Sequence, residues 1–262
     1  MKITRKQFLG VAATSGVASL IATRTAPLAA ADNTQEREPF RRAGSHGPKK
    51  LEKAAIKGAT AATVRFIRET KAAAIPPAVF AQAKRCLIDG FGVILAGSTV
   101  RGSEIVRDYV RAGTDKRDAT VLGGQGLTTS VAYAALANGA SGHAMDFDDT
   151  QLSTTPDRTY GLLTHPTLPP LCAALAVGEA QNVPGAAFLE AFAIGFEVEC
   201  KIAEAIDPAH YNNGFHSSGT IGTFGAAAAA AKLMNLDDRA LAHMLAIASS
   251  TAAGIRVNFG SM

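Results

Sequence analysis

Apolar and alanine positions recur at helical spacing along most of this chain. Between residues 78 and 96, Ala83, Cys86, Leu87 and Ile94 fall on one face of a helix, and such a stripe is typical of a helix packed on a core. The same periodicity predicts helices over residues 51–70, 78–96, 103–110, 128–144, 168–180, 185–206, 218–236 and 238–255. The pattern therefore predicts an all-α fold.

One short run departs from helical spacing. Residues 119–122, with the sequence Ala-Thr-Val-Leu, favour a strand, and the glycine cluster at 123–126 ends it. This cluster reads Gly-Gly-Gln-Gly and is not followed by Lys-Ser or Lys-Thr, so it lacks the pattern of a phosphate-binding loop. We expect one short strand here and no phosphate loop.

Composition supports helices that pack closely. The chain has 262 residues, of which 47% are hydrophobic and 18% charged, and this suffices for one large core or two small ones. Tryptophan is absent, aromatic residues make up 6%, and alanine is abundant. Alanine has a high helix propensity and is depleted in strands, so the composition agrees with the helical pattern.

The first 50 residues differ from the rest. Residues 1–31 have a basic start, an uncharged run and a small-residue ending, Ala29-Ala30-Ala31, which together indicate an export signal with a cleavage site. The stretch Thr4-Arg5-Lys6-Gln7-Phe8-Leu9-Gly10 resembles the twin-arginine export motif, with Lys6 in place of the second arginine. The run is too short and too mildly apolar for a stable membrane anchor. We expect periplasmic export, with a polar linker over residues 32–50.

The net charge of +4 belongs to this leader. Residues 1–31 carry four basic side chains and no acidic one, which accounts for the whole of the net charge. From residue 51 onward the chain shows no basic stripe and carries a small negative charge. The pI of about 9.0 therefore does not indicate a nucleic-acid partner.

The cysteines do not form a recognisable metal motif. Cys86, Cys172 and Cys200 are far apart, and no pair has the CxxC spacing of zinc ribbons or iron–sulfur proteins. An odd number of cysteines also argues against a complete disulfide framework. We expect buried free thiols.

The densest group of reactive side chains lies at residues 142–150, Gly-His-Ala-Met-Asp-Phe-Asp-Asp-Thr. Acids this close repel one another, which raises the pKa of at least one of them unless each has its own partner. If the preceding helix continues through the segment, Asp146 shares a face with both His143 and Thr150, because residues three and four apart are neighbours on a helix. The alternative is a helix end with solvated acids.

Two histidines stand at predicted helix starts. His165 precedes the helix at 168, and His216 precedes the helix at 218. A helix N-terminus favours a carboxylate ligand, so both histidines could line one anion-binding pocket. Each histidine alone is better explained as a capping or core residue, but the two together with the acidic cluster favour a ligand-binding site. Glu197, Glu199 and Lys201 lie together on a predicted helix, where Glu197 and Lys201 are four apart and are interpreted as a helix ion pair.

Five motifs follow one another in a fixed order. They are Ile75-Pro76-Pro77, Cys86-Leu87-Ile88-Asp89-Gly90-Phe91-Gly92-Val93, residues 142–150, His165-Pro166-Thr167, and Gly214-Phe215-His216 with Gly222-Thr223-Phe224-Gly225-Ala226-Ala227. From about Leu51 to its last residue, the chain thereby resembles the MmgE/PrpD family, which includes 2-methylcitrate dehydratase and cis-aconitate decarboxylase. Because several motifs match in order, the resemblance is far stronger than any single one of them.

The resemblance implies a large helical domain followed by a smaller α/β lid domain, usually in a homodimer, and no metal or other cofactor. By motif match, Asp146, His165 and His216 are expected to be catalytic and Thr150 to bind substrate. His143, from the same cluster, is expected to bind substrate as well.

The resemblance also marks two departures. Relatives continue past a motif similar to Asn258-Phe259-Gly260-Ser261-Met262 into a lysine, a further histidine and the lid. We therefore expect residues 51–262 to be an incomplete helical domain, with the α/β lid missing. The loop at 151–164 is longer than in relatives, which indicates a different choice of substrate.

These features predict a lyase that dehydrates a 2-methylcitrate-like acid by cofactor-free acid–base chemistry. Decarboxylation or isomerisation of a related di- or tricarboxylic acid is an alternative. A metal-dependent hydrolase is another, because the oxygen-rich set His143, Asp146, Asp148 and Asp149 suits Mg²⁺ or Mn²⁺. The last is a fragment that is inactive or binds carboxylates without turnover.

Overall fold

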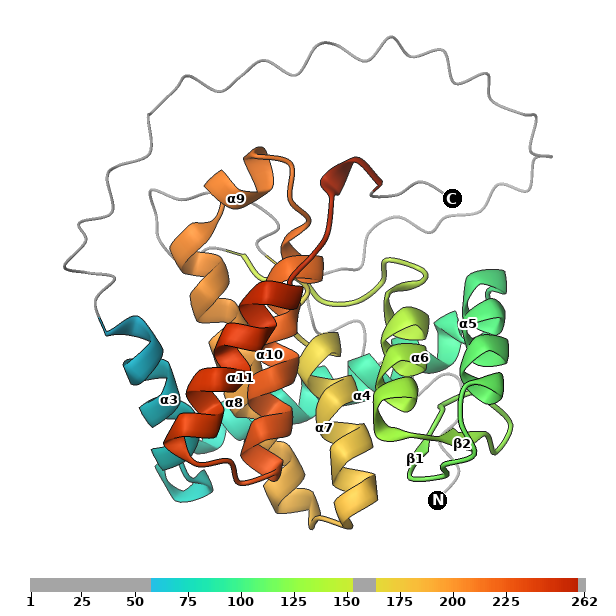
Figure 1. The fold of residues 1–262 in the computed structure, drawn as a ribbon, viewed down its shortest axis with the longest axis horizontal. Helices are drawn as coiled ribbons and strands as arrows, with labels where there is room; N and C mark the ends of the chain where they lie inside the picture. Colours follow the sequence, from blue (N-terminus) through green and yellow to red (C-terminus); the bar gives the residue numbers. More distant parts are fainter. Residues whose placement is uncertain (1–57, 153–163, 259–262) are drawn as a thin grey trace, which may run out of the picture. The chain divides into compact units, whose positions relative to one another are not determined.

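The computed structural model describes residues 58–152 and 164–258, and helices dominate both ranges (Figure 1). The helices are α3 (Ala59–Glu69), α4 (Pro77–Gly97), α5 (Arg101–Ala112), α6 (Val131–His143), α7 (Leu168–Gln181), α8 (Gly185–Ile206), α9 (Ala209–Asn212), α10 (Ser217–Leu233) and α11 (Asp238–Thr251), with 3-10 turns η1 (Ala72–Ala74) and η2 (Arg256–Asn258). The all-α prediction is confirmed. Within these ranges, no helix has the length and apolar character needed to cross a membrane. The expected leader and linker lie outside the described residues.

The predicted strand is shorter than expected and has a partner. β1 (Ala119–Thr120) pairs antiparallel with β2 (Thr128–Thr129), with Ala119 opposite Thr129. The sequence pattern had assigned residues 128–130 to the next helix, but two adjacent β-branched threonines suit a strand better. α6 accordingly begins at Val131.

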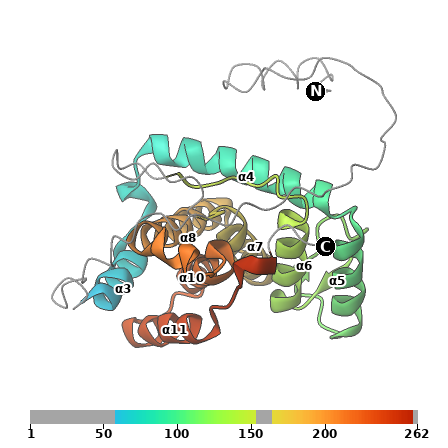
Figure 2. The same ribbon diagram turned by 90° about the horizontal axis from the view of Figure 1, so that it is seen from above.

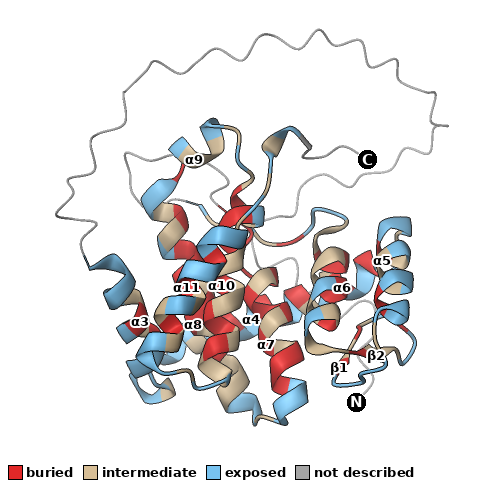
Figure 3. Ribbon diagram, in the orientation of Figure 1, coloured by how far each residue is buried: buried red, intermediate tan, exposed pale blue. Residues whose placement is uncertain are grey.

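The helices form layers around α7, α8 and α10. α10 packs against both α7 and α8, and α7 also contacts α6. Figure 2 shows α4 along one side of this group, where it contacts α6 and α8, and α11 on the opposite side against α10. Buried residues line the inner faces of these helices (Figure 3). Many of the fully buried positions are alanines, as the composition predicts, including Ala174, Ala176, Ala191, Ala203, Ala228 and Ala229.

The chain after α11 returns toward the start of α10. The predicted helix over 238–255 ends at Thr251, and the following residues are extended. The His216 N–H donates to the Gly254 carbonyl oxygen (3.1 Å), and the Arg256 N–H donates to the Gly214 carbonyl oxygen (2.9 Å). These backbone bonds fix the segment that carries His216.

The three cysteines are buried free thiols, as the sequence predicts. Burial raises the pKa of Cys172 to about 12 and also raises the pKa of Cys86 and Cys200. Since the thiolate is the reactive form, these side chains act as small core residues and not as nucleophiles.

Candidate active site

The chain reverses direction directly after α6. The Asp146 N–H donates to the His143 carbonyl oxygen (3.2 Å), and Asp146 adopts a left-handed backbone with a φ of 54°. Aspartate tolerates this conformation better than most residues because its short side chain can bond locally. The helix therefore does not continue to Thr150, and helical spacing does not decide which side chains of this segment meet.

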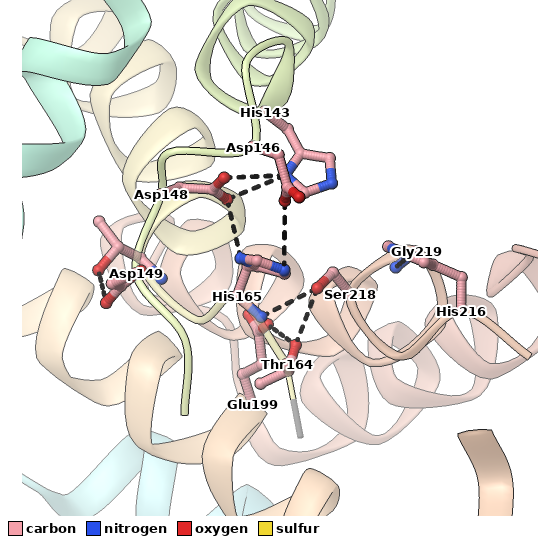
Figure 4. A network of polar contacts seen from close by, with 11 residues as sticks. His143, Asp146, Asp148, Asp149, Thr164, His165, Glu199, His216, Ser218 and Gly219 are labelled. Carbon is pink, nitrogen blue, oxygen red and sulfur yellow. Dashed lines mark hydrogen bonds and ion pairs between the residues drawn. The ribbon is translucent and has the colours of Figure 1, made fainter. Parts of the chain in front are cut away.

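The turn brings the Asp148 carboxylate back onto His143 (Figure 4). Nδ1 of His143 lies 3.0 Å from each carboxylate oxygen of Asp148, whose side chain is 2% exposed. The hydrogen bond to Asp148 raises the pKa of His143, and burial of the imidazole only partly opposes this. His143 therefore keeps its proton to a higher pH than a free imidazole does.

His165 lies next to the same carboxylate. Its Nδ1 is 3.4 Å from Oδ2 of Asp148, and its Nε2 is 3.9 Å from Oδ1 of Asp146. The His165 side chain is 5% exposed and meets the His143 ring at 4.9 Å between centroids. Among the described residues, neither ring nitrogen of His165 has a hydrogen-bond partner. We call His143, Asp146, Asp148 and His165 the Asp–His cluster.

His216 begins α10 beside this cluster. Its Nδ1 accepts the Gly219 N–H (3.1 Å), and its ring lies 6.0 Å from that of His143. Burial lowers the pKa of His216, and the nearby His143 and His165 lower it further. Because Nδ1 accepts a hydrogen bond, the neutral ring carries its proton on Nε2. The prediction that both histidines precede helices is confirmed, since His165 lies two residues before the α7 cap and His216 caps α10.

Asp149 and Thr150 do not join the Asp–His cluster. Asp149 turns toward the start of α7, where its carboxylate accepts from the Thr167 N–H (3.2 Å) and the Thr167 hydroxyl (2.7 Å). Burial raises the pKa of Asp149. Thr150 is exposed, and in the described part of the chain it makes no hydrogen bond to the cluster. Of the residues the sequence singles out, the structure gathers His143, Asp146, Asp148, His165 and His216.

The Asp–His cluster opens into a cavity of about 510 Å³. His143, Asp148, His165 and His216 line it together with Ser218 and mainly apolar residues, among them Leu136, Leu168, Pro169 and Cys172. Convergent polar groups in a mostly apolar pocket are typical of small-molecule sites. The N-terminus of α10 adjoins the same cavity through His216, Ser218 and Gly219, and its N–H groups favour an anion there.

A second cavity, also of about 510 Å³, lies against α3, α4 and α8. Its walls include Phe66, Val79, Phe192 and Phe196, and none of its lining residues is a histidine. We assign the candidate site to the first cavity because the titratable cluster lies there.

Two cations that could hold a polyanion, Lys201 and Arg256, lie away from the cavity. Lys201 is exposed and pairs with Glu204 (3.0 Å) and Glu197 (3.8 Å) on the surface of α8. The Arg256 guanidinium lies over the Tyr211 ring and donates to its carbonyl oxygen (3.3 Å). Neither residue lines the cavity, whereas His143, whose pKa is raised by Asp148, does.

One buried group escaped the sequence analysis. Glu199 is fully buried on α8, and its Oε1 accepts from the Thr164 hydroxyl at 2.7 Å. The helix ion pair predicted between Glu197 and Lys201 is confirmed at 3.8 Å, but no role was predicted for Glu199, which lies between them in the chain. A usable signal was present, because residues 192, 195 and 199 follow the spacing of one buried helix face.

The Asp–His cluster has donors that suit a divalent cation. Each of its four residues offers one ligand atom, and these atoms all lie within 4.8 Å of one another. Imidazole nitrogens with carboxylate oxygens suit Zn²⁺ or Mn²⁺. The set differs from the one expected from the sequence, because His165 takes the place of Asp149.

Comparison with known proteins identifies relatives of this chain. The family model of the MmgE/PrpD N-terminal domain matches residues 61–262. The chain is 30% identical over 208 residues to the cis-aconitate decarboxylase of Homo sapiens (78% of this chain, 41% of the human protein). It is 30% identical over 202 residues to the Mus musculus cis-aconitate decarboxylase (75% and 40%). It is 31% identical over 201 residues to the cis-aconitate decarboxylase-like protein oryM of Aspergillus oryzae (75% and 40%). The chain spans about two fifths of the length of these relatives.

Proposed function

Because this chain belongs to the MmgE/PrpD family, we propose that it acts as a lyase on a small di- or tricarboxylic acid. The names of its relatives favour release of CO2 from a cis-aconitate-like acid. Dehydration of a 2-methylcitrate-like acid and isomerisation of a related acid stay as alternatives, because each needs an imidazole that transfers a proton beside bound carboxylates.

The observation that carries this proposal is the position of His165. The ring is nearly buried at the cavity, lies between Asp148 and Asp146, and has two nitrogens without a hydrogen-bond partner among the described residues. A core histidine would have its nitrogens satisfied. Both nitrogens are buried, and because neither is engaged in a hydrogen bond in the described part of the chain, either can accept or give up a proton when a ligand meets the ring at the cavity wall.

Decarboxylation requires a proton at a defined point. When the bond between a carboxylate carbon and the substrate skeleton breaks, CO2 leaves and the electron pair stays on the substrate as a carbanion. His165 in its protonated form then donates a proton to that carbanion. Asp148 orients the ring, and Asp146, whose side chain is 56% exposed, connects the ring to solvent protons.

The remaining groups hold the substrate. His143, which keeps its proton through its bond to Asp148, offers positive charge to a carboxylate. His216 offers the Nε2 proton of its neutral ring, and the α10 N-terminus favours an anion beside it. We keep Thr150 as a proposed hydroxyl donor from the exposed side of the turn.

Product analysis tests the proposal. The purified protein is incubated separately with carboxyl-labelled cis-aconitate, citrate and 2-methylcitrate, and products are followed by ¹³C NMR. Release of labelled CO2 supports a decarboxylase, whereas loss or addition of water without CO2 assigns a hydro-lyase. Saturable binding of these acids without any turnover would favour the carboxylate-binding alternative and contradict the lyase.

The four ligand atoms of the Asp–His cluster favour one second candidate, a metal-dependent hydrolase. In that case a divalent cation would bind His143, Asp146, Asp148 and His165 and activate a water molecule. Dialysis against a chelator separates the two functions, because acid–base turnover survives it and metal-dependent turnover is lost until Zn²⁺ or Mn²⁺ is restored.

We also propose export to the periplasm through the twin-arginine-like leader, and a homodimer as the assembled form. Lys6 stands where the twin-arginine motif has its second arginine. Cell fractionation with variants Arg5→Gln and Lys6→Gln tests the route, and light scattering of the purified protein tests the assembly. A protein that remains in the cytoplasm, or a monomer at micromolar concentration, would contradict the respective proposal.

A further inference from the structure

Glu199 links three separate segments behind the Asp–His cluster (Figure 4). The Thr164 hydroxyl donates to Oε1 of Glu199 at 2.7 Å and lies 3.4 Å from the Ser218 hydroxyl oxygen. The Ser218 oxygen also accepts the His165 N–H at 2.9 Å. The carboxyl group of α8, residues 164–165 and the first turn of α10 are therefore joined by consecutive hydrogen bonds.

The structure provides room for this carboxyl group. A Cβ built on Gly225 would lie 2.4 Å from Oε2 of Glu199, so a side chain at position 225 cannot coexist with Glu199 as it stands. A Cβ on Gly222 would lie 3.6 Å from Oε1. The face of α10 that meets α8 thus carries glycine where the carboxyl group lies, and this allows the acid to enter the helix interface.

The surroundings suit a neutral acid. Glu199 is 0% exposed, and burial raises its pKa to about 8, although the bond from Thr164 opposes the rise. In the described part of the chain, Asp149 is the charged group that acts on it, and it is an acid, so no cation compensates a negative charge. Oε2 has no hydrogen-bond partner among those residues. An ionised Glu199 would be an uncompensated buried charge.

We infer that Glu199 is a positioning residue, whose buried carboxyl group holds Thr164 and the backbone of His165 against α10 so that the His165 ring faces Asp148. Glu199 does not line the cavity, so it acts on the chemistry through His165 and not on substrate directly. The catalytic consequence rests on the proposed function, but the effect on the His165 ring does not.

Three variants test the inference in the full chain. Glu199→Gln keeps a neutral acceptor for Thr164, Glu199→Leu removes it at similar size, and Thr164→Val removes the donor. We expect Glu199→Leu and Thr164→Val each to lower kcat roughly 100-fold, since small displacements of a catalytic group have effects of this size. Glu199→Gln should retain kcat of the same order as the unaltered protein. The double variant Glu199→Leu with Thr164→Val should be no slower than either single variant, because both break one link.

The pH profile gives a readout that a purely structural role would not move. The titratable neighbours of Glu199 are Asp149, from the turn after α6, and Cys200, next to it on α8, while α10 faces it with glycines. Ionisation of Glu199 at alkaline pH would strengthen its bond from Thr164 but would place an uncompensated charge between α8 and α10, and we expect this charge to disturb the position of His165 and reduce kcat. Glu199→Gln cannot ionise and should keep its kcat to a higher pH.

Histidine ring NMR tests the inference even if no turnover is found with the chosen acids. The His165 signal, assigned through its loss in His165→Gln, should shift in Glu199→Leu and Thr164→Val but not in Glu199→Gln, while the His243 signal stays unchanged in all three. An unchanged His165 signal and kcat in Glu199→Leu and Thr164→Val would overturn the inference. A loss of kcat in Glu199→Gln as large as in Glu199→Leu would also overturn it, because an ionised carboxylate would then be required.

Discussion

Both carboxylate oxygens of Asp148 lie 3.0 Å from Nδ1 of His143. The two residues are five apart in sequence, so no helix could bring them together this way, and the left-handed turn at Asp146 does so. The same carboxylate faces His165 at 3.4 Å, so one buried acid orients two imidazoles at the wall of the cavity. This relationship raises the pKa of His143 and holds the nearly buried His165 ring at the cavity wall.

Replacing Asp148 should change the titration of His143. The bond to Asp148 raises the pKa of His143 above 6.5, so Asp148→Asn should lower it, as ring NMR over a pH series can measure. A raised pKa in the folded state contributes stability that is full below the pKa of the unfolded chain and is lost as pH rises through the folded value. The stabilising effect of the pair should therefore fade at alkaline pH. Asp115→Asn, at an exposed acid, is the control, and an unchanged His143 pKa in Asp148→Asn would contradict the assignment.

Replacing His216 should separate helix capping from chemistry. Its Nδ1 caps α10 by accepting the Gly219 N–H, and asparagine can supply a similar acceptor. His216→Ala should lower the free energy of unfolding by about 1 kcal/mol, as loss of an N-cap typically does, whereas His216→Asn should not. Both variants should lose most turnover because the Nε2 proton is gone. Full turnover in His216→Asn would show that the imidazole serves only as a cap.

The buried acid Glu199 should make stability depend on pH. Its pKa is raised from 4.5 to about 8, so the folded state holds a proton that the unfolded chain releases. Its contribution to stability is therefore full below pH 4.5 and is lost as pH rises toward 8. Glu199→Gln should gain stability relative to the unaltered protein over this window, as urea unfolding at a series of pH values can measure. If the free energies of unfolding of Glu199→Gln and the unaltered protein differed by the same amount at pH 4.5 and at pH 8, this would contradict the raised pKa.

Asp149 should matter for folding more than for catalysis. It accepts two hydrogen bonds from Thr167 at the start of α7 and stands apart from the Asp–His cluster. Asp149→Ala should lower the free energy of unfolding by about 1–3 kcal/mol, because buried donors lose their partner. Thr167→Val should lower the free energy of unfolding by less in a protein that already carries Asp149→Ala than in the unaltered protein, since the two side chains share one interaction. A normal unfolding curve combined with lost turnover would instead assign Asp149 to the site.

Much of the fold follows from the spacing of apolar and small residues. The helices from α4 to α11 are long enough to be recognised as runs of apolar and small residues, apart from α9, which has only four residues and gives no such signal. The sequence predicted β1 but not its partner β2, because a strand of two residues is too short to show an alternation of apolar and polar positions. The helices predicted over 218–236 and 238–255 extend past the observed ends of α10 at Leu233 and of α11 at Thr251, because a single sequence does not fix where the chain leaves a helix.

The sequence singled out the residues of the Asp–His cluster but did not predict their geometry. Periodicity stops at the end of α6, so the sequence could not show that Asp148 faces His143 while Asp149 turns toward Thr167. The role of Glu199 was missed because a carboxyl group is usually solvated, and its burial depends on the glycines of a helix remote in sequence.

Turnover by three forms of the protein tests the central claim most directly. The unaltered protein, His165→Gln and the control His243→Gln, which alters an exposed histidine of α11, are compared for release of labelled CO2 from cis-aconitate. The account predicts that the unaltered protein and His243→Gln turn over alike and that His165→Gln is slower by about 10²–10⁴-fold, the range for loss of a general acid. Turnover in His165→Gln equal to that of the unaltered protein would contradict the account.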